Sequence, residues 1–450
     1  MITCLKNVHT IVSCDPDDTV CHNTDLWLQD HLIAGIGPCG LKADRVIDAS
    51  DLIVYPGLVN VHHHLYQFFT RNLARVQNLE LFDWLKALYG VWKNLNEETV
   101  YLSSAAGMGQ LMRYGCTTCF DHHYVFPKNG GDLIDAQFAA ADRLGIRMHA
   151  SRGSMDLSEK DGGLPPDSVV QDVDTILSDT ESAIAKYHDP SRFSMRRIVF
   201  APCSPFSASA ELYRRSAILA RKHGVQLHTH LCETKDEETY TLAEFGKRPF
   251  RYLEELGWTG DDVFYAHGIH FSDDELDRIA QTKTKIAHCP CSNMKLSSGV
   301  MRLPDMIDRN ICVGLAVDGS ASNDGSDLMD EMRTAYLLHR FSWGERAPSG
   351  YQILKMATVG SAKVLGRDDI GSIEIGKAAD LFAIKRSVTD LLCANEDPKN
   401  LFGGVGYHRP CDLVIVNGQI TVRDGKLTRI DEEDLYKRSE KELDRFLSFR

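Results

Sequence analysis

Short apolar runs alternate with longer stretches of helical periodicity through the middle of the chain. Residues 81–95, 210–223 and 273–281 repeat apolar positions every three or four residues, as amphipathic helices do. Strand and helix alternating about eight times predict an α/β fold, a (β/α)8 TIM-like barrel. A doubly wound sheet is the alternative, but no glycine-rich phosphate turn follows the first strand. The predicted strands are the run that ends at Val61 and the runs at 117–120, 146–150, 198–201, 225–228, 263–266, 285–288 and 311–317.

Both ends of the chain show a different pattern. Residues 1–55 place apolar pairs between turn signals without a helical period, which predicts short strands in an antiparallel β unit. The β pattern returns in residues 371–384 and again on either side of Asn417-Gly418, a hairpin signal. Residues 431–450 are rich in both acidic and basic side chains and predict a surface helix.

Composition excludes several classes of protein. A net charge of −13 argues against nucleic acid as the main partner, because phosphate binding needs clustered Lys and Arg. No apolar run approaches the roughly 18 residues of a membrane span, and the first residues lack the pattern of a signal peptide. Thirteen scattered cysteines predict reduced thiols in a cytoplasmic protein. Cys116 and Cys119 form a single Cys-x-x-Cys motif, with no second motif at the spacing of a zinc finger. These features leave a small-molecule substrate as one class of partner and say little else.

Side chains that bind metals or transfer protons follow nearly every predicted strand. The active site of a barrel lies at the carboxyl ends of its strands, so these side chains are expected to meet there. A single histidine in such a place is more often a hydrogen-bonded structural residue, but the whole set indicates a metal-containing active site. In chain order the set is His62 and His64, Asp121 to His123, His149 and Arg152, Cys203 and Ser204, His228, His230 and Glu233, His267, His288, and Asp318.

Several of these segments together resemble the amidohydrolase superfamily, in its cytosine/guanine deaminase and triazine hydrolase branch. The resemblance covers essentially the whole chain and implies a barrel over residues 56–370. It also implies a small β-sandwich domain built from residues 1–55 and 371–450. Residues 62–67, 77–85 and 201–207 look closest to 8-oxoguanine deaminases. The matching segments are 56–64, 228–234, 266–268, 288–293, 317–319 and the Gly-Lys-Ala-Ala-Asp-Leu stretch at 376–381.

The resemblance implies one divalent metal ion, Zn²⁺. Three histidines and one carboxylate form a normal zinc set that leaves a position open for water. His228 shares a strand face with His230 and is the rival ligand, and the family pattern selects His230. No lysine follows the fourth strand, which favours one metal, and Cys203 is the alternative ligand for a second. The implied ligands are His62, His64, His230 and Asp318.

The resemblance also implies the acid and base of a hydrolytic reaction. Asp318 is expected to take the proton of the attacking water and pass it to the departing amine. Glu233 would protonate a ring nitrogen, and His267 would hydrogen-bond the attacking oxygen or a ring carbonyl. From spacing alone, Glu233 reads as a cap of the acidic stretch 235–238. Four further residues are candidates for substrate binding: Gln77, Arg152, Cys203 and His122. Gln77 reads equally well as a surface loop residue.

The predicted reaction is deamination of 8-oxoguanine to urate and ammonia by a homo-oligomer. A hydroxytriazine alkylaminohydrolase is the first alternative, with isocytosine, isoxanthopterin or guanine deaminases beside it. A non-enzymatic relative that serves in assembly is disfavoured, because all four implied metal ligands, Glu233 and His267 are present. His288 is expected to be either a partner of the site or a core residue.

Overall fold

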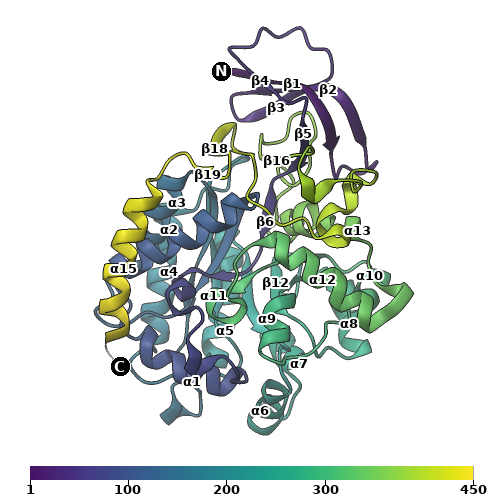
Figure 1. Ribbon diagram of the computed structural model, residues 1–450. Coiled ribbons are helices and arrows are strands. Elements are labelled where there is room, and N and C mark those ends of the chain that lie inside the picture. The colour runs from purple at the N-terminus through teal and green to yellow at the C-terminus, as the bar shows by residue number, and fades with distance from the viewer. Residues whose placement is uncertain (449–450) are drawn as a thin grey trace.

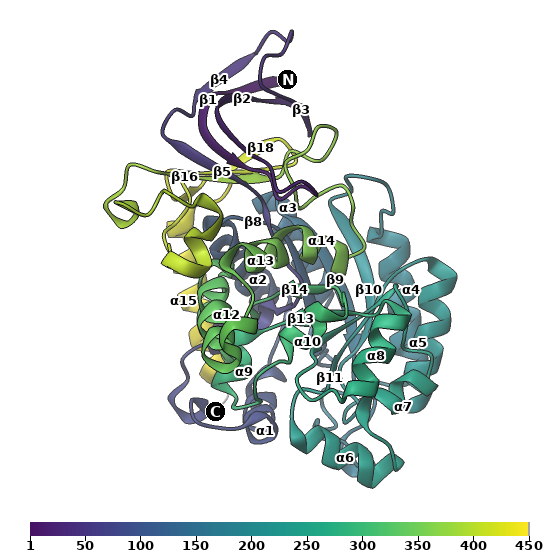
Figure 2. The same ribbon diagram turned by 90° about the vertical axis from the view of Figure 1, so that its right-hand side faces the viewer.

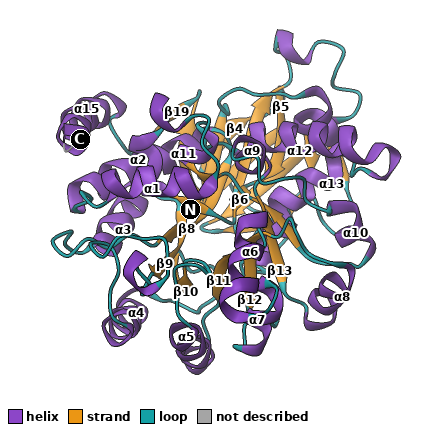
Figure 3. Ribbon diagram, turned by 90° about the horizontal axis from the view of Figure 1, so that it is seen from below, coloured by secondary structure: helices purple, strands orange, loops and turns teal. Residues whose placement is uncertain are grey.

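Parallel strands surrounded by helices form the body of the protein (Figure 3). The computed structural model describes residues 1–448. Within that range one sheet contains eight parallel strands in the order β14-β13-β12-β11-β10-β9-β8-β6, which confirms the predicted barrel. The strands are β6 (Leu58–Asn60), β8 (Cys116–His123), β9 (Arg147–Ser154), β10 (Arg196–Pro202), β11 (Leu227–Leu231), β12 (Val263–His267), β13 (Lys285–His288) and β14 (Val313–Leu315).

The barrel closes where its first and last strands meet. A short parallel pair, β7 (His63–His64) with β15 (Asp318–Gly319), joins the segments that follow β6 and β14. The Asp318 backbone N–H donates to the His62 carbonyl at 3.1 Å. The Asn60 side-chain oxygen accepts from the Val317 N–H at 3.0 Å. The closing seam therefore places two predicted metal-binding segments side by side.

The helices begin and end at residues that suit their termini. α5 begins after Ser209, whose side chain accepts from the Leu212 N–H, and ends at Gly224 in the left-handed region. The longer helices are α1 (Leu81–Trp92), α2 (Glu97–Arg113), α3 (Leu133–Leu144), α4 (Val173–Tyr187), α5 (Ala210–His223), α6 (Lys235–Phe245), α8 (Asp273–Thr282), α12 (Leu328–Trp343) and α15 (Glu432–Ser448). Shorter ones are α7 (Pro249–Glu255), α9 (Pro290–Lys295), α10 (Leu303–Asp308), α11 (Ser320–Asn323), α13 (Gly350–Lys355) and α14 (Ser361–Val364). None of these helices is long and apolar enough to cross a membrane, as far as residues 1–448 show.

Strands from both chain ends share one further sheet, which lies above the barrel in Figures 1 and 2. β4 and β5 run parallel to β1, so the sheet is mixed rather than antiparallel as expected. β5 pairs with β16 and thereby connects the two ends. The strands are β1 (Ile2–Val12), β2 (Val20–Gln29), β3 (Leu32–Ile36), β4 (Arg45–Asp48), β5 (Leu52–Pro56), β16 (Leu381–Lys385), β17 (Leu413–Val416), β18 (Gln419–Arg423) and β19 (Lys426–Leu427).

A buried ion pair links this sheet to the barrel. The guanidinium of Arg147, on β9, binds the Asp380 carboxylate with a closest distance of 3.0 Å, and both side chains are buried. Asp380 also accepts from the Asn417 N–H at 2.6 Å. Arg147 donates to both oxygens of Asp380, and such a bidentate buried pair fixes the orientation of the parts that it joins.

Candidate metal centre and active site

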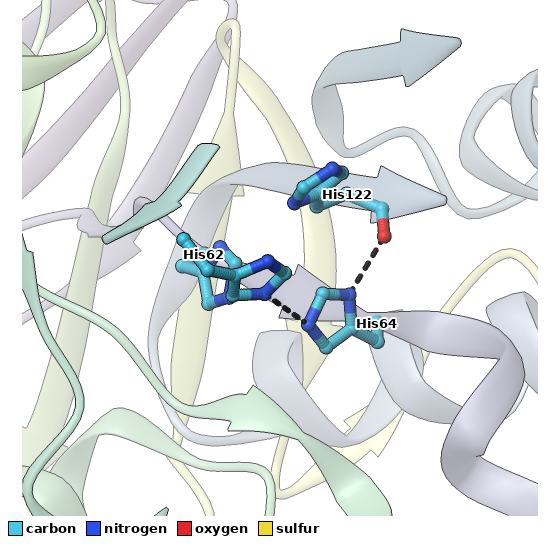
Figure 4. Close-up of side chains that lie close together, drawn as sticks. His62, His64 and His122 are labelled. Atoms are coloured by element: carbon cyan, nitrogen blue, oxygen red, sulfur yellow. Dashed lines mark hydrogen bonds between the residues drawn. The ribbon is translucent and has the colours of Figure 1, made fainter. Parts of the chain in front are cut away.

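Four predicted ligand residues converge at the barrel seam. His62 Nε2 and His64 Nε2 each lie 3.3 Å from Asp318 Oδ1. His64 Nε2 lies 3.1 Å from His230 Nε2. His62, His64 and Asp318 are buried, and His230 enters from β11. The first two imidazoles appear together in Figure 4.

Hydrogen bonds on the far side of each ring fix where its proton sits. The His64 Nδ1–H donates to the His122 carbonyl at 2.7 Å, as the dashed line in Figure 4 shows. The His230 Nδ1–H donates to the Cys203 carbonyl at 2.6 Å. Each neutral ring then carries its lone pair on Nε2. Two lone pairs that face each other at 3.1 Å repel unless a cation lies between them, so the pair fits a shared metal ion.

A third histidine is oriented through a relay. The His228 Nδ1–H donates to the Phe264 carbonyl at 3.0 Å, which leaves His228 Nε2 as an acceptor. His62 Nδ1 lies 2.9 Å from that nitrogen and is its donor. His62 Nε2 has no hydrogen-bond partner among the described residues and points its lone pair toward the same centre. Three nitrogen lone pairs and one carboxylate thus form a buried cluster that could hold a divalent metal ion, and His228 contacts it through His62.

Electrostatics agree with neutral ligands. Burial lowers the pKa of His62 well below its usual value and that of His230 to about 4. Both rings are therefore unprotonated near neutral pH, as metal binding requires.

A second acidic side chain faces the centre beside a histidine. Glu233 Oε2 lies 3.5 Å from His267 Nε2, and the Ser298 hydroxyl donates to Glu233 Oε1 at 3.2 Å. The Asn293 amide donates to His267 Nδ1 at 3.0 Å, so His267 carries its proton on Nε2. Burial raises the pKa of Glu233 well above its usual value, and Asp318 and Glu237 raise it further. Burial and the neighbouring carboxylates therefore favour the protonated form of Glu233, next to an imidazole whose Nε2–H faces it.

Asp318 is held by two hydroxyls that sequence reasoning missed. The Ser292 and Ser322 hydroxyls donate to Asp318 Oδ2 at 2.5 and 3.3 Å. The Gly319 backbone N–H donates to Oδ1 at 2.7 Å. Ser292 lies in the His-Cys-Pro-Cys-Ser segment that carried part of the resemblance, but nothing in the sequence of that segment marks this serine as a partner of Asp318.

His64, His230 and Asp318 border a small pocket. Leu81, Trp84 and Leu85 of α1 form part of its wall, and its free volume is about 30 Å³. That volume holds little more than ordered water. A ring substrate therefore needs side chains of the pocket wall to move. The remaining lining residues are Gln67, Tyr124, Cys203, Phe206, Glu233, His267, Leu296 and Ser322.

Gln67 is the polar lining residue that the sequence analysis did not select. It is buried, and neither atom of its amide has a hydrogen-bond partner within residues 1–448. A Cβ at Gly319 would lie 1.9 Å from Gln67 Oε1, so this glycine makes room for the amide. The position of Gln67 three residues after His64, in the His-His-His-Leu-Tyr-Gln segment, was the available signal.

The four predicted substrate-binding residues lie in different places. Cys203 lines the pocket. The His122 ring donates from Nε2 to the Ala201 carbonyl at 3.0 Å. Its Nδ1 has no hydrogen-bond partner among the described residues and lies in one cluster with ring nitrogens of His62, His64 and His230. The Arg152 guanidinium binds Asp179 at 3.0 Å and stacks on Phe126. Neither Arg152 nor Gln77 is among the described residues that line the pocket.

His288 does not reach the pocket. Its Nε2 lies 2.9 Å from Nε2 of His339, and both rings are buried. Of the two expectations for His288, the structure therefore shows a core residue.

The fold and the site define a metal-dependent hydrolase of the barrel type. A model of the Amidohydrolase family matches residues 53–421, and the chain belongs to this family. Hydroxydechloroatrazine ethylaminohydrolase of Pseudomonas sp. strain ADP is 39% identical over 450 residues, covering 96% of this chain and 93% of that protein. 8-Oxoguanine deaminase of Pseudomonas aeruginosa is 44% identical over 394 residues, covering 88% and 86%. Atrazine chlorohydrolase from Arthrobacter aurescens TC1, solved with zinc, superposes with a TM-score of 0.94 at 30% identity, covering 98% and 100%.

Proposed function

We propose that this protein is a zinc-dependent deaminase that hydrolyses 8-oxoguanine to urate and ammonia. The observation that carries the proposal is the pairing of Glu233 with His267, 3.5 Å apart, on the same pocket as the metal residues. A metal site alone fits many hydrolases. A carboxyl kept protonated beside a neutral imidazole adds the proton that a ring nitrogen needs during attack on the adjacent carbon.

The chain's own residues carry the proton transfers in this proposal. Zinc bound by His62, His64, His230 and Asp318 would supply Lewis acidity that makes water a nucleophile near neutral pH. Asp318 accepts a proton from the attacking water and delivers it to the departing amine. Glu233 protonates the ring nitrogen as the ring carbon becomes tetrahedral, and the His267 Nε2–H hydrogen-bonds the attacking oxygen. Water adds to the amino-bearing carbon and ammonia leaves, so no oxidant or reductant is needed.

The pocket walls support a flat, polar-edged ring. Trp84, Tyr124 and Phe206 offer apolar surface for the faces of a heterocycle. Gln67 offers one donor and one acceptor with no partner in the described chain, which suits an amide edge such as N–H beside C=O. Leaving such a buried amide unpaired is costly, so a ring with that edge is favoured over one without it.

A hydroxytriazine alkylaminohydrolase is the second candidate. Leu81, Leu85 and Leu296 line the pocket and would accommodate an alkyl substituent on the leaving amine. The 39% identical relative carries the name of such an enzyme. Isocytosine, isoxanthopterin and guanine are further rings with an amino-bearing carbon and an amide edge.

A substrate panel separates these candidates. Purified enzyme loaded with zinc is assayed for ammonia and for ethylamine on 8-oxoguanine, guanine, isocytosine, isoxanthopterin and hydroxyatrazine. We expect the highest kcat/KM on 8-oxoguanine, with urate and ammonia formed in equal amounts. Ethylamine release from hydroxyatrazine without ammonia from 8-oxoguanine would overturn the substrate assignment and leave the metal assignment intact.

A further inference from the structure

The backbone that presents Glu233 to the pocket turns sharply after β11. Cys232 adopts φ 54°, in the left-handed region that few residues other than glycine adopt. The Cys232 carbonyl accepts from the Ile269 N–H at 2.9 Å and the His270 N–H at 3.0 Å. Those bonds hold the turn from the β12 side. Two N–H groups of the turn remain, those of Cys232 and Glu233.

Both of these N–H groups are bound by one side chain. Glu237 Oε1 accepts from the Cys232 N–H at 3.0 Å, and Glu237 Oε2 accepts from the Glu233 N–H at 2.9 Å. The Glu237 side chain is buried on the first turn of α6. The backbone N–H of Glu237 donates to the Thr234 hydroxyl at 3.4 Å. One carboxylate thus spans the two peptide groups on either side of the bend.

This pattern differs from ordinary helix capping. In a capping box, the glutamate three residues after the N-cap reaches back to the N-cap N–H. The N-cap of α6 is Thr234, but Glu237 reaches past it to the two preceding residues. Its carboxylate serves the turn that carries Glu233 rather than the helix end.

We propose that Glu237 is a positioning residue, whose carboxylate holds the Cys232–Glu233 turn so that the Glu233 carboxyl faces His267. The inference rests on the proposed role of Glu233 as the acid. Glu237 does not line the pocket, so it acts on the pocket through the Cys232–Glu233 turn that it binds.

The charge of Glu237 acts in the same direction as its hydrogen bonds. Its ionised form favours the protonated form of Glu233, because two negative charges close together in a buried site repel. Burial raises the pKa of Glu237 itself to about 7, the two N–H groups lower it, and Glu238 raises it. Other groups that face Glu237 are the Cys232 thiol and the Tyr213 hydroxyl. Arg248 lies beyond, paired with Glu238 and Glu275.

The test compares Glu237→Gln with Glu238→Gln. Gln keeps the shape of Glu but turns an N–H₂ toward one of the two backbone donors. Glu238 is the next residue on α6 and pairs with Arg248 and Lys235. The two N–H groups of the turn donate to Glu237 and not to Glu238, so Glu238 is the matched control. We expect Glu237→Gln to lower kcat at least tenfold, with KM changed less than threefold and zinc content unchanged. The alkaline limb of the kcat profile should also move to lower pH. Glu238→Gln should behave as wild type.

A double variant shows whether Glu237 acts through Glu233. Glu233→Gln with Glu237→Gln should be no slower than Glu233→Gln alone, because the positioned acid is already lost. Multiplied effects in the double variant, or Glu237→Gln activity equal to the Glu238→Gln control, would overturn the inference. Near-normal kcat in Glu233→Gln would instead remove the proposed acid and the inference with it.

A second variant covers the case in which Glu237→Gln does not fold. Glu237→Asp keeps the charge but is one methylene too short to reach both N–H groups. We expect a folded, zinc-binding protein with kcat reduced and its pH profile unshifted. Wild-type kcat in Glu237→Asp would contradict the positioning role.

Discussion

Single protons decide the chemistry of this site. The Phe264 carbonyl fixes the tautomer of His228, and His228 fixes that of His62, so that the nitrogen facing Asp318 is the one with a free lone pair. His64 and His230 reach the same state through single carbonyl acceptors. Three ligands are therefore oriented before any metal arrives, which reduces the reorganisation that binding requires.

We predict that His228→Phe weakens zinc binding. The ring volume is kept, but His62 loses its acceptor and is free to adopt the other tautomer. Removing such an outer hydrogen bond lowers metal affinity about 10- to 100-fold. Competition with a fluorescent zinc chelator measures the change. His288→Phe, which alters a buried histidine paired with His339 away from the pocket, serves as the control and should leave affinity unchanged. Equal affinity in both variants would contradict the relay.

A second residue-scale prediction concerns pH and stability. Asp121 is buried and accepts from the Leu65 N–H at 2.6 Å and the Gln137 amide at 2.5 Å. Burial raises its pKa from 3.8 to about 7. Between these values the folded state holds a proton that the unfolded state releases. The free energy of unfolding therefore falls as pH rises from about 4 to 7, by up to about 1.4 kcal/mol per pH unit.

Asp121→Asn should remove that dependence. Its oxygen still accepts from Leu65, and Gln137 can flip to accept from the new amide, because its Oε1 has no described partner. We expect the variant to be more stable than wild type at pH 8 and no more stable at pH 5, by urea denaturation at both. A variant equally destabilised at both pH values would show that the carboxyl is ionised throughout.

At the scale of elements, α1 forms part of the pocket wall. It lies at the end of the barrel away from the mixed sheet (Figure 1), and three of its side chains line the pocket. We predict that α1 opens in the free enzyme and closes over bound ligand. Amide hydrogen exchange in residues 81–92 should slow when a non-hydrolysed ring analogue binds, while exchange in α5 stays constant. Unchanged amide exchange in residues 81–92 at saturating ligand would show that the substrate enters the pocket by another route.

Elements were predictable where local signals agree. The periodicity of residues 210–223 predicts a helix, and in the structure α5 has the same bounds, with Ser209 before it and Gly224 after it. The run at residues 52–61 divides at Gly57 into β5 and β6, which belong to different sheets. Gly57 passes so close to Thr117 that a Cβ would lie 2.2 Å from its hydroxyl, and the apolar pattern of the run does not reveal this contact. His62, His64, His230 and Asp318 followed strand ends and met as predicted. Arg152 also followed a strand, but Asp179 on α4 turns it away, and only tertiary packing reveals such a partner.

At the scale of the whole molecule, the metal residues also close the barrel. His64 and Asp318 belong to the two strands of the seam, and His230 stands across from them on β11. We predict that removing the metal lowers the melting temperature of the whole protein, because unshared lone pairs and a carboxylate then face one another. Free zinc at a thousandfold excess over Kd should stabilise by about 4 kcal/mol.

Calorimetry with and without a chelator measures this effect. One equivalent of zinc per chain should restore the melting temperature, since no lysine after β10 offers a bridge to a second ion. An unchanged melting temperature in metal-free protein, or two tightly held ions in active enzyme, would contradict the single-metal seam.

The seam also sets when the protein becomes an enzyme during its synthesis. The segments that pair across it, His63–His64 and Asp318–Gly319, lie near opposite ends of the barrel sequence. A growing chain makes His62 and His64, two of the proposed ligands, after its first barrel strand, and makes Asp318 only after all eight barrel strands. Contacts so distant in sequence form slowly, because a long loop must close first. A nascent or truncated chain that lacks Asp318 therefore has the imidazoles of the proposed site without its carboxylate, and metal capture would mark the completed barrel.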